Sequence, residues 1–367
     1  MNDTIGLFLE LLKAALWKQY PEPAVKQTGA NHSCLTNADW NGVRRIAEKQ
    51  AVAGLMADGI SLLPQDMMPP FEMKMRFIAD AMATARRNAE VAREMQRVCT
   101  LLQDSNVKVA FFKGQIAGAR YSNPDHRTPG DVDFISDNPA LAERLMVEHG
   151  GKLGGIVPKH AEIWMDGVLF ESHRMALDLA YPPSQAYFNR QIRRMLHEGV
   201  GKECVGDMEM PCLTPALEVC HCTAHINHHF LEVGIGLRQI ADFAMLLTEK
   251  KSLIDIAELR RHLCGTHMLR FFRALEALCV EHLGMPEEAV VIPYGNGDKK
   301  NGLLIMQSAI NGGNFGRYDG KDKSNGFRRM MISMGKAMRY FRMSPLEALF
   351  RPTMTVRVWL WVHRCIS

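Results

Sequence analysis

Two aspartates lie two residues apart at the start of an apolar run, in the stretch HRTPGDVDFI (126–135). In a β-strand, residues i and i+2 point to the same face, so the side chains of Asp131 and Asp133 would lie close together. Like charges that close repel each other, and one carboxyl group would be pushed towards protonation unless a cation lay between them. The alternative is a polar turn, because Pro129, Gly130 and Asp131 all favour turns.

Other polar residues stand at the ends of neighbouring predicted elements. The run VKVAFFKG predicts a strand that ends in Lys113 and Gly114 and is followed by a short helix. Backbone N–H groups at a helix start, with a lysine beside them, suit a phosphate. Glu171 lies in another predicted strand, VLFESH. Three carboxylates on neighbouring strands can hold two divalent cations against a triphosphate, because hard cations such as Mg²⁺ prefer carboxylate and phosphate oxygens.

The elements that position these residues follow the order strand, helix, strand, helix, hairpin. DVDFIS predicts the second strand, and the next helix has Asn138 as its N-cap and Pro139 in its first position. The hairpin is predicted in HAEIWMDGVLFESHRMA, where Asp166–Gly167 joins two extended runs. This order predicts an α+β core.

Helical periodicity dominates the chain before this core. Residues 4–19 form one predicted helix, and residues 35–60 form another, capped by Asn37 or Asp39. A long segment rich in Ala, Met and Arg contains no internal Pro or Gly, so it predicts a single helix that ends near Ser105–Asn106.

Helical patterns return after the core, whereas PYGNGDKKNG (293–302) predicts a Gly- and Asn-rich loop. Residues 312–326 are polar and are also predicted as a loop. We therefore expect four regions, namely a helical region (1–105), the α+β core (106–210), helices that pack on the core (211–292), and a loop with a basic segment (293–367).

Composition is that of a globular protein. The 367 residues are 47% hydrophobic and 23% charged, and the net charge of +4 is too small to indicate nucleic-acid binding by itself. Nine cysteines without a CxxC pair predict reduced thiols and a cytoplasmic location. Glu10 and Lys13 interrupt the first apolar run, so no secretory signal is expected, and no run is long enough for a transmembrane segment.

The C-terminal segment has a different charge balance. Residues 317–367 contain eleven Lys and Arg against three Asp and Glu, a net charge of +8. This asymmetry indicates an anionic partner such as a phosphate-rich acceptor, a nucleic acid or an anionic membrane surface. A solvated basic helix explains it equally well.

The core motifs resemble a known family. FFKGQIAGARYSNPDHRTPGDVDFI is similar to the signature KG…Y…P…R…GDxD of uncharacterised nucleotidyltransferases in the DNA polymerase β superfamily. VLFESHR resembles the strand that carries the third acid, and CTAHINHH…GIGLRQIADFAMLL resembles a helical segment of the family. The resemblance covers about residues 105–250. It implies the nucleotidyltransferase fold, a mixed sheet with flanking helices, and transfer of a nucleoside monophosphate from an NTP to an acceptor.

The resemblance also implies residue roles. The catalytic, metal-binding acids for two Mg²⁺ or Mn²⁺ ions would be Asp131, Asp133 and Glu171. Lys113 and Gly114 correspond to the phosphate loop, in which Gln115 stands where the wider superfamily usually has Ser or Gly.

Four further residues are candidates for substrate binding. Arg127 precedes Asp131 by four residues, which suits a phosphate or acceptor contact as well as a turn cap. His173 shares a strand face with Glu171, so it either orients that acid or is structural. Arg238 and Asp242 are four residues apart on a predicted helix, and a simple intrahelical ion pair is their alternative explanation. Because both lie off the apolar stripe of that helix, we expect Arg238 at the mouth of the cleft.

The histidines of HCTAHINHH form a competing cluster. His221, His225 and His228 or His229 share one helical face, and two histidines at i and i+4 can bind zinc. HExxH is absent, so a helix that packs on the core and uses these histidines in hydrogen bonds is favoured.

Two classes of function fit this sequence. The first is a metal-dependent nucleotidyltransferase that acts on a small molecule, a protein or an RNA acceptor. The second is a catalytically silent nucleotide-binding protein with the same fold, acting as a regulator or adaptor. The presence of all three acids favours the enzyme.

Overall fold

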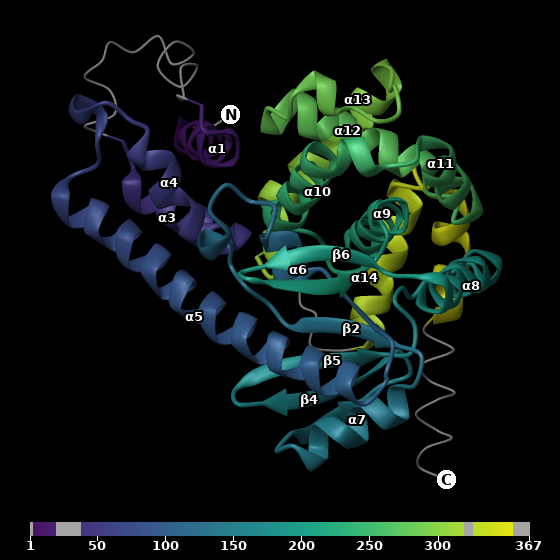
Figure 1. The fold of residues 1–367 in the computed structure, drawn as a ribbon. Helices are drawn as coiled ribbons and strands as arrows, with labels where there is room; N and C mark the ends of the chain where they lie inside the picture. Colours follow the sequence, from purple (N-terminus) through teal and green to yellow (C-terminus); the bar gives the residue numbers. More distant parts are fainter. Residues whose placement is uncertain (1–2, 20–37, 319–325, 355–367) are drawn as a thin grey trace.

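The computed structural model describes residues 3–19, 38–318 and 326–354. Its centre is a seven-stranded mixed sheet in the order β3-β4-β5-β2-β1-β7-β6 (Figure 1). β2 is antiparallel to β1 and parallel to β5, and β7 is parallel to β1. The strands are β1 (Val109–Phe112), β2 (Val132–Ser136), β3 (Lys152–Ile156), β4 (His160–Met165), β5 (Val168–His173), β6 (Gly201–Val205) and β7 (Met208–Cys212). The α+β prediction is confirmed.

Three of the seven strands were missed from the sequence. β3 reads KLGGI and is exposed along its whole length, so it shows no apolar alternation. β6 and β7 pair around a turn in which Gly206 has φ of +61° and precedes Asp207. A Gly-Asp dipeptide between two extended runs is a hairpin signal, and it would have identified both strands.

Four helices precede the sheet within the described residues. They are α1 (Asp3–Trp17), α3 (Trp40–Gln50), α4 (Ala53–Ser61) and α5 (Phe71–Asp104). The long helix is confirmed, because α5 runs without interruption to Ser105 and lies along the sheet (Figure 1). Asp39 caps α3 by accepting a hydrogen bond from the backbone N–H of Gly42.

The prediction of one helix over residues 35–60 was wrong, since α3 and α4 are separated at Ala51 and Val52. Ala51 adopts the left-handed conformation, with φ of +57°, and its N–H closes the end of α3. A Cβ on Gly59 would lie 2.2 Å from the carbonyl oxygen of Leu11, so α4 approaches α1 very closely. Packing of α4 against α1 thus requires the chain to change direction between α3 and α4. The continuous apolar pattern of the sequence does not indicate this change.

Helices cover the other side of the sheet after β5. They include α8 (Pro182–Glu198), α9 (Pro215–Glu232), α10 (Leu237–Lys250), α11 (Ile256–Gly265), α12 (Leu269–Leu283), α13 (Asn296–Gly312) and α14 (Gly326–Arg339). The core itself contains α6 (Gly114–Gly118) and α7 (Pro139–Glu148), and Asn138 caps α7 as predicted. None of the described helices has the length and apolar character of a membrane span.

The predicted loop at 293–302 was wrong, because α13 begins at Asn296. A Cβ on Gly302 would lie 2.8 Å from the carbonyl oxygen of Ala274. Gly302 therefore allows α13 to pack closely against α12, instead of lying in a loop as predicted. The expected basic segment is covered only in part, since residues 319–325 and 355–367 lie outside the described residues.

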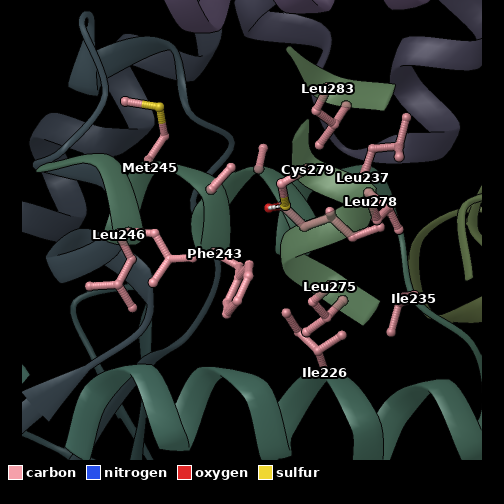
Figure 2. Close-up of a cluster of buried hydrophobic side chains, with 14 of the residues drawn as sticks. Ile226, Ile235, Leu237, Phe243, Met245, Leu246, Leu275, Leu278, Cys279 and Leu283 are labelled. Atoms are coloured by element: carbon pink, nitrogen blue, oxygen red, sulfur yellow. Dashed lines mark hydrogen bonds between the residues drawn. The ribbon is translucent and has the colours of Figure 1, made fainter. Parts of the chain in front are cut away.

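The sheet separates two hydrophobic clusters. Ala110 and Phe112 of β1 belong to the cluster under the C-terminal helices, whereas Val109 and Phe111 belong to the cluster under α5 and α7. The apolar stripe of α10 packs in the first cluster as predicted, with side chains that meet those of α9 and α12 (Figure 2). Because Asp133 is paired with Phe112 in the register of the sheet, it faces the C-terminal helices.

One buried glutamine joins three distant parts of the chain. Gln50, at the end of α3, is 1% exposed. Its Nε2 donates to the carbonyl oxygen of Ala309 at 3.0 Å, and its Oε1 accepts from the backbone N–H of Leu237 at 2.9 Å. The N-terminal helices are therefore tied to both α10 and α13.

Candidate active site

The three carboxylates converge at one edge of the sheet. Asp133 and Glu171 are directly opposite each other on the parallel strands β2 and β5, and Asp131 immediately precedes β2. All three line a cleft between the sheet and helices α9 and α10. The polar-turn alternative therefore does not account for Asp133, which lies within the strand and is 7% exposed.

The acids have opposite electrostatic environments. Burial and the neighbouring charges of Asp133 and Glu171 raise the pKa of Asp131 to about 6. Burial also opposes ionisation of Asp133, but the charges of Lys113 and His173 hold the pKa of Asp133 well below its ordinary value. Glu171 is half-buried, which by itself would raise its pKa, but the hydrogen bond from His173 lowers the pKa overall. The repulsion within the cluster is therefore borne mainly by Asp131.

Lys113 occupies a strained position next to these acids. Its φ of +60° and ψ of −149° fall in a region that side-chain-bearing residues rarely adopt, and Gly114 follows with φ of +42°. Such strain persists only where the surroundings impose it, and it is concentrated at functional sites. The Nζ of Lys113 lies 2.7 Å from Oδ1 of Asp133, so the turn directs an ammonium group at the acid cluster.

His173 connects the acids to the sheet. Its Nε2 lies 2.8 Å from Oδ1 of Asp133 and 3.1 Å from Oε2 of Glu171, and its Nδ1 lies 3.2 Å from the carbonyl oxygen of Met175. All three partners are acceptors, a pattern that favours the protonated ring. Burial opposes this charge, but the two carboxylates raise the pKa of His173 overall. The structure therefore places His173 within hydrogen-bond distance of both acids.

Arg127 and Asp242 form a buried ion pair beside the cleft. The Nε and Nη2 of Arg127 donate to the two carboxylate oxygens of Asp242 at 2.7 and 2.8 Å, and the hydroxyl of Tyr121 donates to Oδ1 at 2.8 Å. Arg127 is 4% exposed. Its guanidinium is thus committed to Asp242, an arrangement that suits positioning of the loop before β2 better than direct phosphate contact.

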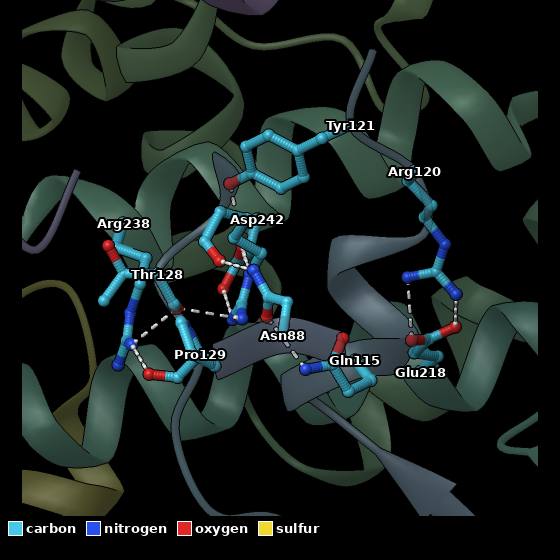
Figure 3. Close-up of polar contacts among 10 residues, drawn as sticks. Asn88, Gln115, Arg120, Tyr121, Thr128, Pro129, Glu218, Arg238 and Asp242 are labelled. Atoms are coloured by element: carbon cyan, nitrogen blue, oxygen red, sulfur yellow. Dashed lines mark hydrogen bonds and ion pairs between the residues drawn. The ribbon is translucent and has the colours of Figure 1, made fainter. Parts of the chain in front are cut away.

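Arg238 is directed towards the acid cluster rather than towards Asp242. Its Nη1 donates to the carbonyl oxygens of Thr128 and Pro129 at 3.1 and 3.3 Å (Figure 3). It lines the same cleft as Asp131, and its charge partly opposes the rise in the pKa of that acid. The structure thus places the Arg238 guanidinium at the cleft, on the Asp131 side.

Two contacts in Figure 3 were not expected from the sequence. The Nε2 of Gln115 donates to Oδ1 of Asn88 on α5 at 2.9 Å, so this side chain is held by a structural partner. Arg120 forms a buried bidentate pair with Glu218 of α9 at 2.9 and 2.8 Å, and both residues line the cleft. Their separation of 98 positions explains why no local pattern revealed the pair.

The histidines of α9 form a neutral aromatic row. His221 and His225 stack with ring centroids 5.8 Å apart, His229 lies 4.4 Å from His225, and the ring of Phe315 lies 5.0 Å from His229. Burial lowers the pKa of His221 to about 3 and lowers the pKa values of His225 and His229 well below the ordinary value. These four rings line the cleft that also contains the acids. The cleft has a volume of about 430 Å³.

His228 contacts the ring of His229, with centroids 5.2 Å apart, but it does not line the cleft. Together with His229 and Glu232 it forms a group of potential metal ligands among the described residues. Arg351, however, lies 3.2 Å from the carboxylate of Glu232 and supplies a positive charge there. A zinc ion would compete with this guanidinium, so the geometry favours the packing role for α9.

Comparison with known proteins gives the family. Residues 36–284 match the family described as uncharacterised nucleotidyltransferase, which is more than half of the chain. The chain belongs to this nucleotidyltransferase family. The match confirms the resemblance at the level of the family and extends beyond residues 105–250 on both sides.

Solved structures show more distant likenesses to this nucleotidyltransferase. One is a solution structure of the antibiotic-resistance factor ANT(2'')-Ia, with 10% identity, a TM-score of 0.35, and coverage of 53% of this chain and 100% of that chain. Another is an antigenic nucleotidyltransferase-like protein from Paracoccidioides brasiliensis, with 13% identity, a TM-score of 0.32, and coverage of 54% and 92%. No curated protein matches the chain. These likenesses are too distant to bear on substrates.

The donor set of this nucleotidyltransferase fits divalent cations. Three carboxylates converge, and their mutual repulsion contributes to the raised pKa of Asp131. Lys113 and His173 both contact the same oxygen of Asp133, which shows that positive charge is favoured there. Hard cations take such oxygen ligands readily. His160, with Nδ1 at 3.2 Å from Oε2 of Glu171, completes a further group of possible ligands with Glu171 and His173.

Proposed function

We propose that this protein transfers a nucleoside monophosphate from an NTP to a hydroxyl or phosphate group of an acceptor, using two Mg²⁺ or Mn²⁺ ions. Membership of the nucleotidyltransferase family supports nucleotidyl transfer in general. The observation that carries the finer proposal is the convergence of Asp131, Asp133 and Glu171 in a cleft that also contains Lys113 and Arg238.

The acids have separate tasks in this proposal. Asp131 and Asp133 hold both cations, and Glu171 completes the site on the acceptor side. When bound, the cations activate the acceptor oxygen and stabilise the leaving pyrophosphate. Glu171 takes the acceptor proton, directly or through water, while the acceptor oxygen bonds to the α-phosphorus and the bond to pyrophosphate breaks. The hydrogen bond from His173 keeps Glu171 ionised and oriented for this step.

The basic groups hold the triphosphate. Lys113 leaves Asp133 when the acids are occupied and pairs with a phosphate oxygen. Arg238 offers a planar guanidinium whose Nε is buried and has no hydrogen-bond partner within the described structure. A phosphate that reaches this atom would satisfy it and could form two parallel bonds with the guanidinium. Arg127 and Asp242 act by fixing the loop that presents Asp131 and the helix that presents Arg238.

The direct test is incubation of the protein with labelled ATP, CTP, GTP or UTP and Mg²⁺ or Mn²⁺, with and without a chelator. We expect nucleotide to stabilise the protein in a thermal melt only when the metal is present, and labelled product to form with the correct acceptor. Absence of nucleotide binding under all of these conditions would contradict the proposal. Binding of nucleotide without turnover across a broad set of acceptors would instead favour the silent regulator or adaptor.

Arg238→Lys tests the phosphate contact. A lysine keeps the charge and can donate to the carbonyl oxygen of Thr128, but it cannot form two parallel bonds to one phosphate. We expect nucleotide affinity to fall about tenfold, the loss of one charge-assisted hydrogen bond, and the melting temperature to stay nearly unchanged. Calorimetric titration with nucleotide and a melt of both proteins would check this. An unchanged affinity would leave Arg238 with a structural role only.

A further inference from the structure

We infer that the acceptor of this nucleotidyltransferase carries an anionic group, a phosphate or a carboxylate, which is bound by Lys159 and Arg317 beside Glu171. The inference rests on the proposed function and names the class of its second substrate. It follows from an inventory of the charged side chains that line the cleft.

Every carboxylate that lines the cleft is either paired with an arginine or part of the acid cluster. Glu218 is paired with Arg120 through two hydrogen bonds, and Asp242 is paired with Arg127 in the same way. The other three carboxylates in the lining are those of Asp131, Asp133 and Glu171, which form the acid cluster. No acid of the described cleft lining is therefore left to hold a positively charged acceptor.

Two positively charged side chains of the lining are not paired in this way. Lys159 and Arg317 take part in no ion pair among residues 3–19, 38–318 and 326–354. Both are accessible, since Lys159 is half-buried and Arg317 is exposed. Two divalent cations balance the charge of a triphosphate, so these side chains remain available to a further anion after the nucleotide has bound.

Both cations line the same cleft as Glu171. Lys159 directly precedes His160, whose Nδ1 lies 3.2 Å from Oε2 of Glu171. Lys159 also acts electrostatically on His229 at the end of the histidine row. Arg317 follows Phe315 by two residues, and the ring of Phe315 contacts His229. Lys113 acts on His229 as well, but its Nζ lies 2.7 Å from Asp133. Arg238 acts on Asp131, where the triphosphate is proposed to bind.

The segment that carries Arg317 is fixed against the cleft. Asn314 accepts a hydrogen bond from Nε2 of Gln239 on α10 at 3.2 Å. A Cβ on Gly236 would lie 2.9 Å from Cα of Asn314, so the two chain segments are in close contact. Phe315 adopts φ of +52°, a strained conformation for a residue with a side chain. This strain is maintained by packing that directs its ring to His229.

These observations exclude a polyamine as the favoured acceptor. A polycation would meet Lys159 and Arg317 without any uncommitted carboxylate to offset the repulsion. An acceptor with a phosphate or carboxylate would instead gain two charge-assisted contacts while its reactive oxygen lies near Glu171. The basic character of the C-terminal segment, to which Arg317 belongs, agrees with this preference.

The test uses inorganic phosphate as the probe. The full chain is first titrated by calorimetry with Mg²⁺ and a nucleotide analogue that has a methylene group between the α- and β-phosphates, which blocks transfer. The loaded protein is then titrated separately with phosphate, acetate and spermine. The variants are Lys159→Gln and Arg317→Gln, and the control is Lys300→Gln, an exposed lysine on α13 outside the cleft lining.

We expect phosphate to bind the loaded protein, and its affinity to fall about tenfold in each cleft variant but not in the control. Acetate binds more weakly than phosphate or equally well, spermine does not bind, and affinity for the analogue is the same in all variants. The inference is overturned if phosphate and acetate fail to bind, if spermine binds instead, or if the cleft variants lose affinity for the analogue. Failure of the analogue itself to bind wild-type protein would overturn the proposed function, and the first titration reveals it.

Discussion

Replacement of Asp131 and Asp133 together by asparagine is expected to abolish nucleotidyl transfer. Asparagine has nearly the same shape as aspartate but lacks the charge that attracts a divalent cation. Such cations contribute several kcal/mol to the stabilisation of the transition state, so we expect a loss of at least about 10³-fold in rate. Rates of product formation with labelled NTP at saturating Mg²⁺ would measure it. Activity within tenfold of the wild-type rate would contradict a metal role for this pair.

The two single substitutions are expected to affect stability in opposite directions. Asp133 accepts hydrogen bonds from Lys113 and His173, so Asp133→Asn removes two charged contacts and lowers the melting temperature at neutral pH. Asp131 has a raised pKa and is repelled by its neighbours, so Asp131→Asn raises the melting temperature or leaves it unchanged. The double variant should therefore melt close to the wild type, which distinguishes loss of chemistry from loss of fold.

Asp131 and Asp133 should also change the pH dependence of stability in opposite directions. Because the folded-state pKa of Asp131 is raised to about 6, the folded protein holds a proton that the unfolded chain releases. This contribution favours folding below the unfolded pKa of about 4 and is lost as the pH rises towards 6. Asp133 contributes in the opposite sense, because its lowered pKa stabilises the fold above about pH 4 and less in stronger acid. Asp131→Asn should therefore flatten the decline between pH 4 and 6 in urea unfolding experiments.

Arg127→Ala is expected to give the largest loss of stability. The substitution leaves the carboxylate of Asp242 buried without its bidentate partner. Removing one member of a buried ion pair typically costs about 3–5 kcal/mol, because the remaining charge is uncompensated. Urea unfolding of Arg127→Ala, Asp242→Ala and the double variant would measure this. The double variant should lose clearly less than the sum of the single losses, with a coupling of about 2 kcal/mol.

A surface pair provides the control for this cycle. Arg76 and Glu72 lie 2.7 Å apart on α5, and their side chains are 52% and 81% exposed. The same cycle on this pair should give a coupling below about 1 kcal/mol. Equal couplings for the buried and the exposed pair, or additive losses in the buried one, would show that Arg127 does not stabilise the fold through Asp242.

The acid cluster could be predicted because its determinants are local. The spacing of Asp131 and Asp133 and the hairpin signal at Asp166–Gly167 each fix a strand face within a few residues. Glu171 then lies opposite Asp133 once the strands β2 and β5 pair, which required only the correct order of elements.

The contacts that complete the site are not local. Arg120 pairs with Glu218 and Arg127 with Asp242 across separations of 98 and 115 residues, and the sequence near either partner does not indicate the other. Gln115 was expected at the phosphate loop by position alone, but its side chain bonds to α5.

Glycine was the other source of error. Gly302 is predicted in a loop, yet it lies in α13 and allows this helix to pack closely against α12. The same residue type produces both features, because the absence of Cβ permits a turn and also a close approach of two backbones. Only the partner surface decides between them, and that surface is set by the tertiary fold.

Gln50 has a consequence for how the protein can be divided. Its amide group forms hydrogen bonds with backbone groups of Leu237, Ala309 and Ile310, and both Leu237 and Ala309 are fully buried. A shortened chain that starts at the first strand would leave these groups without partners beside the helix that carries Arg238. The cleft therefore cannot be moved into another protein without these helices. The sheet carries the acids, but helices from both ends of the polypeptide keep the cleft rigid.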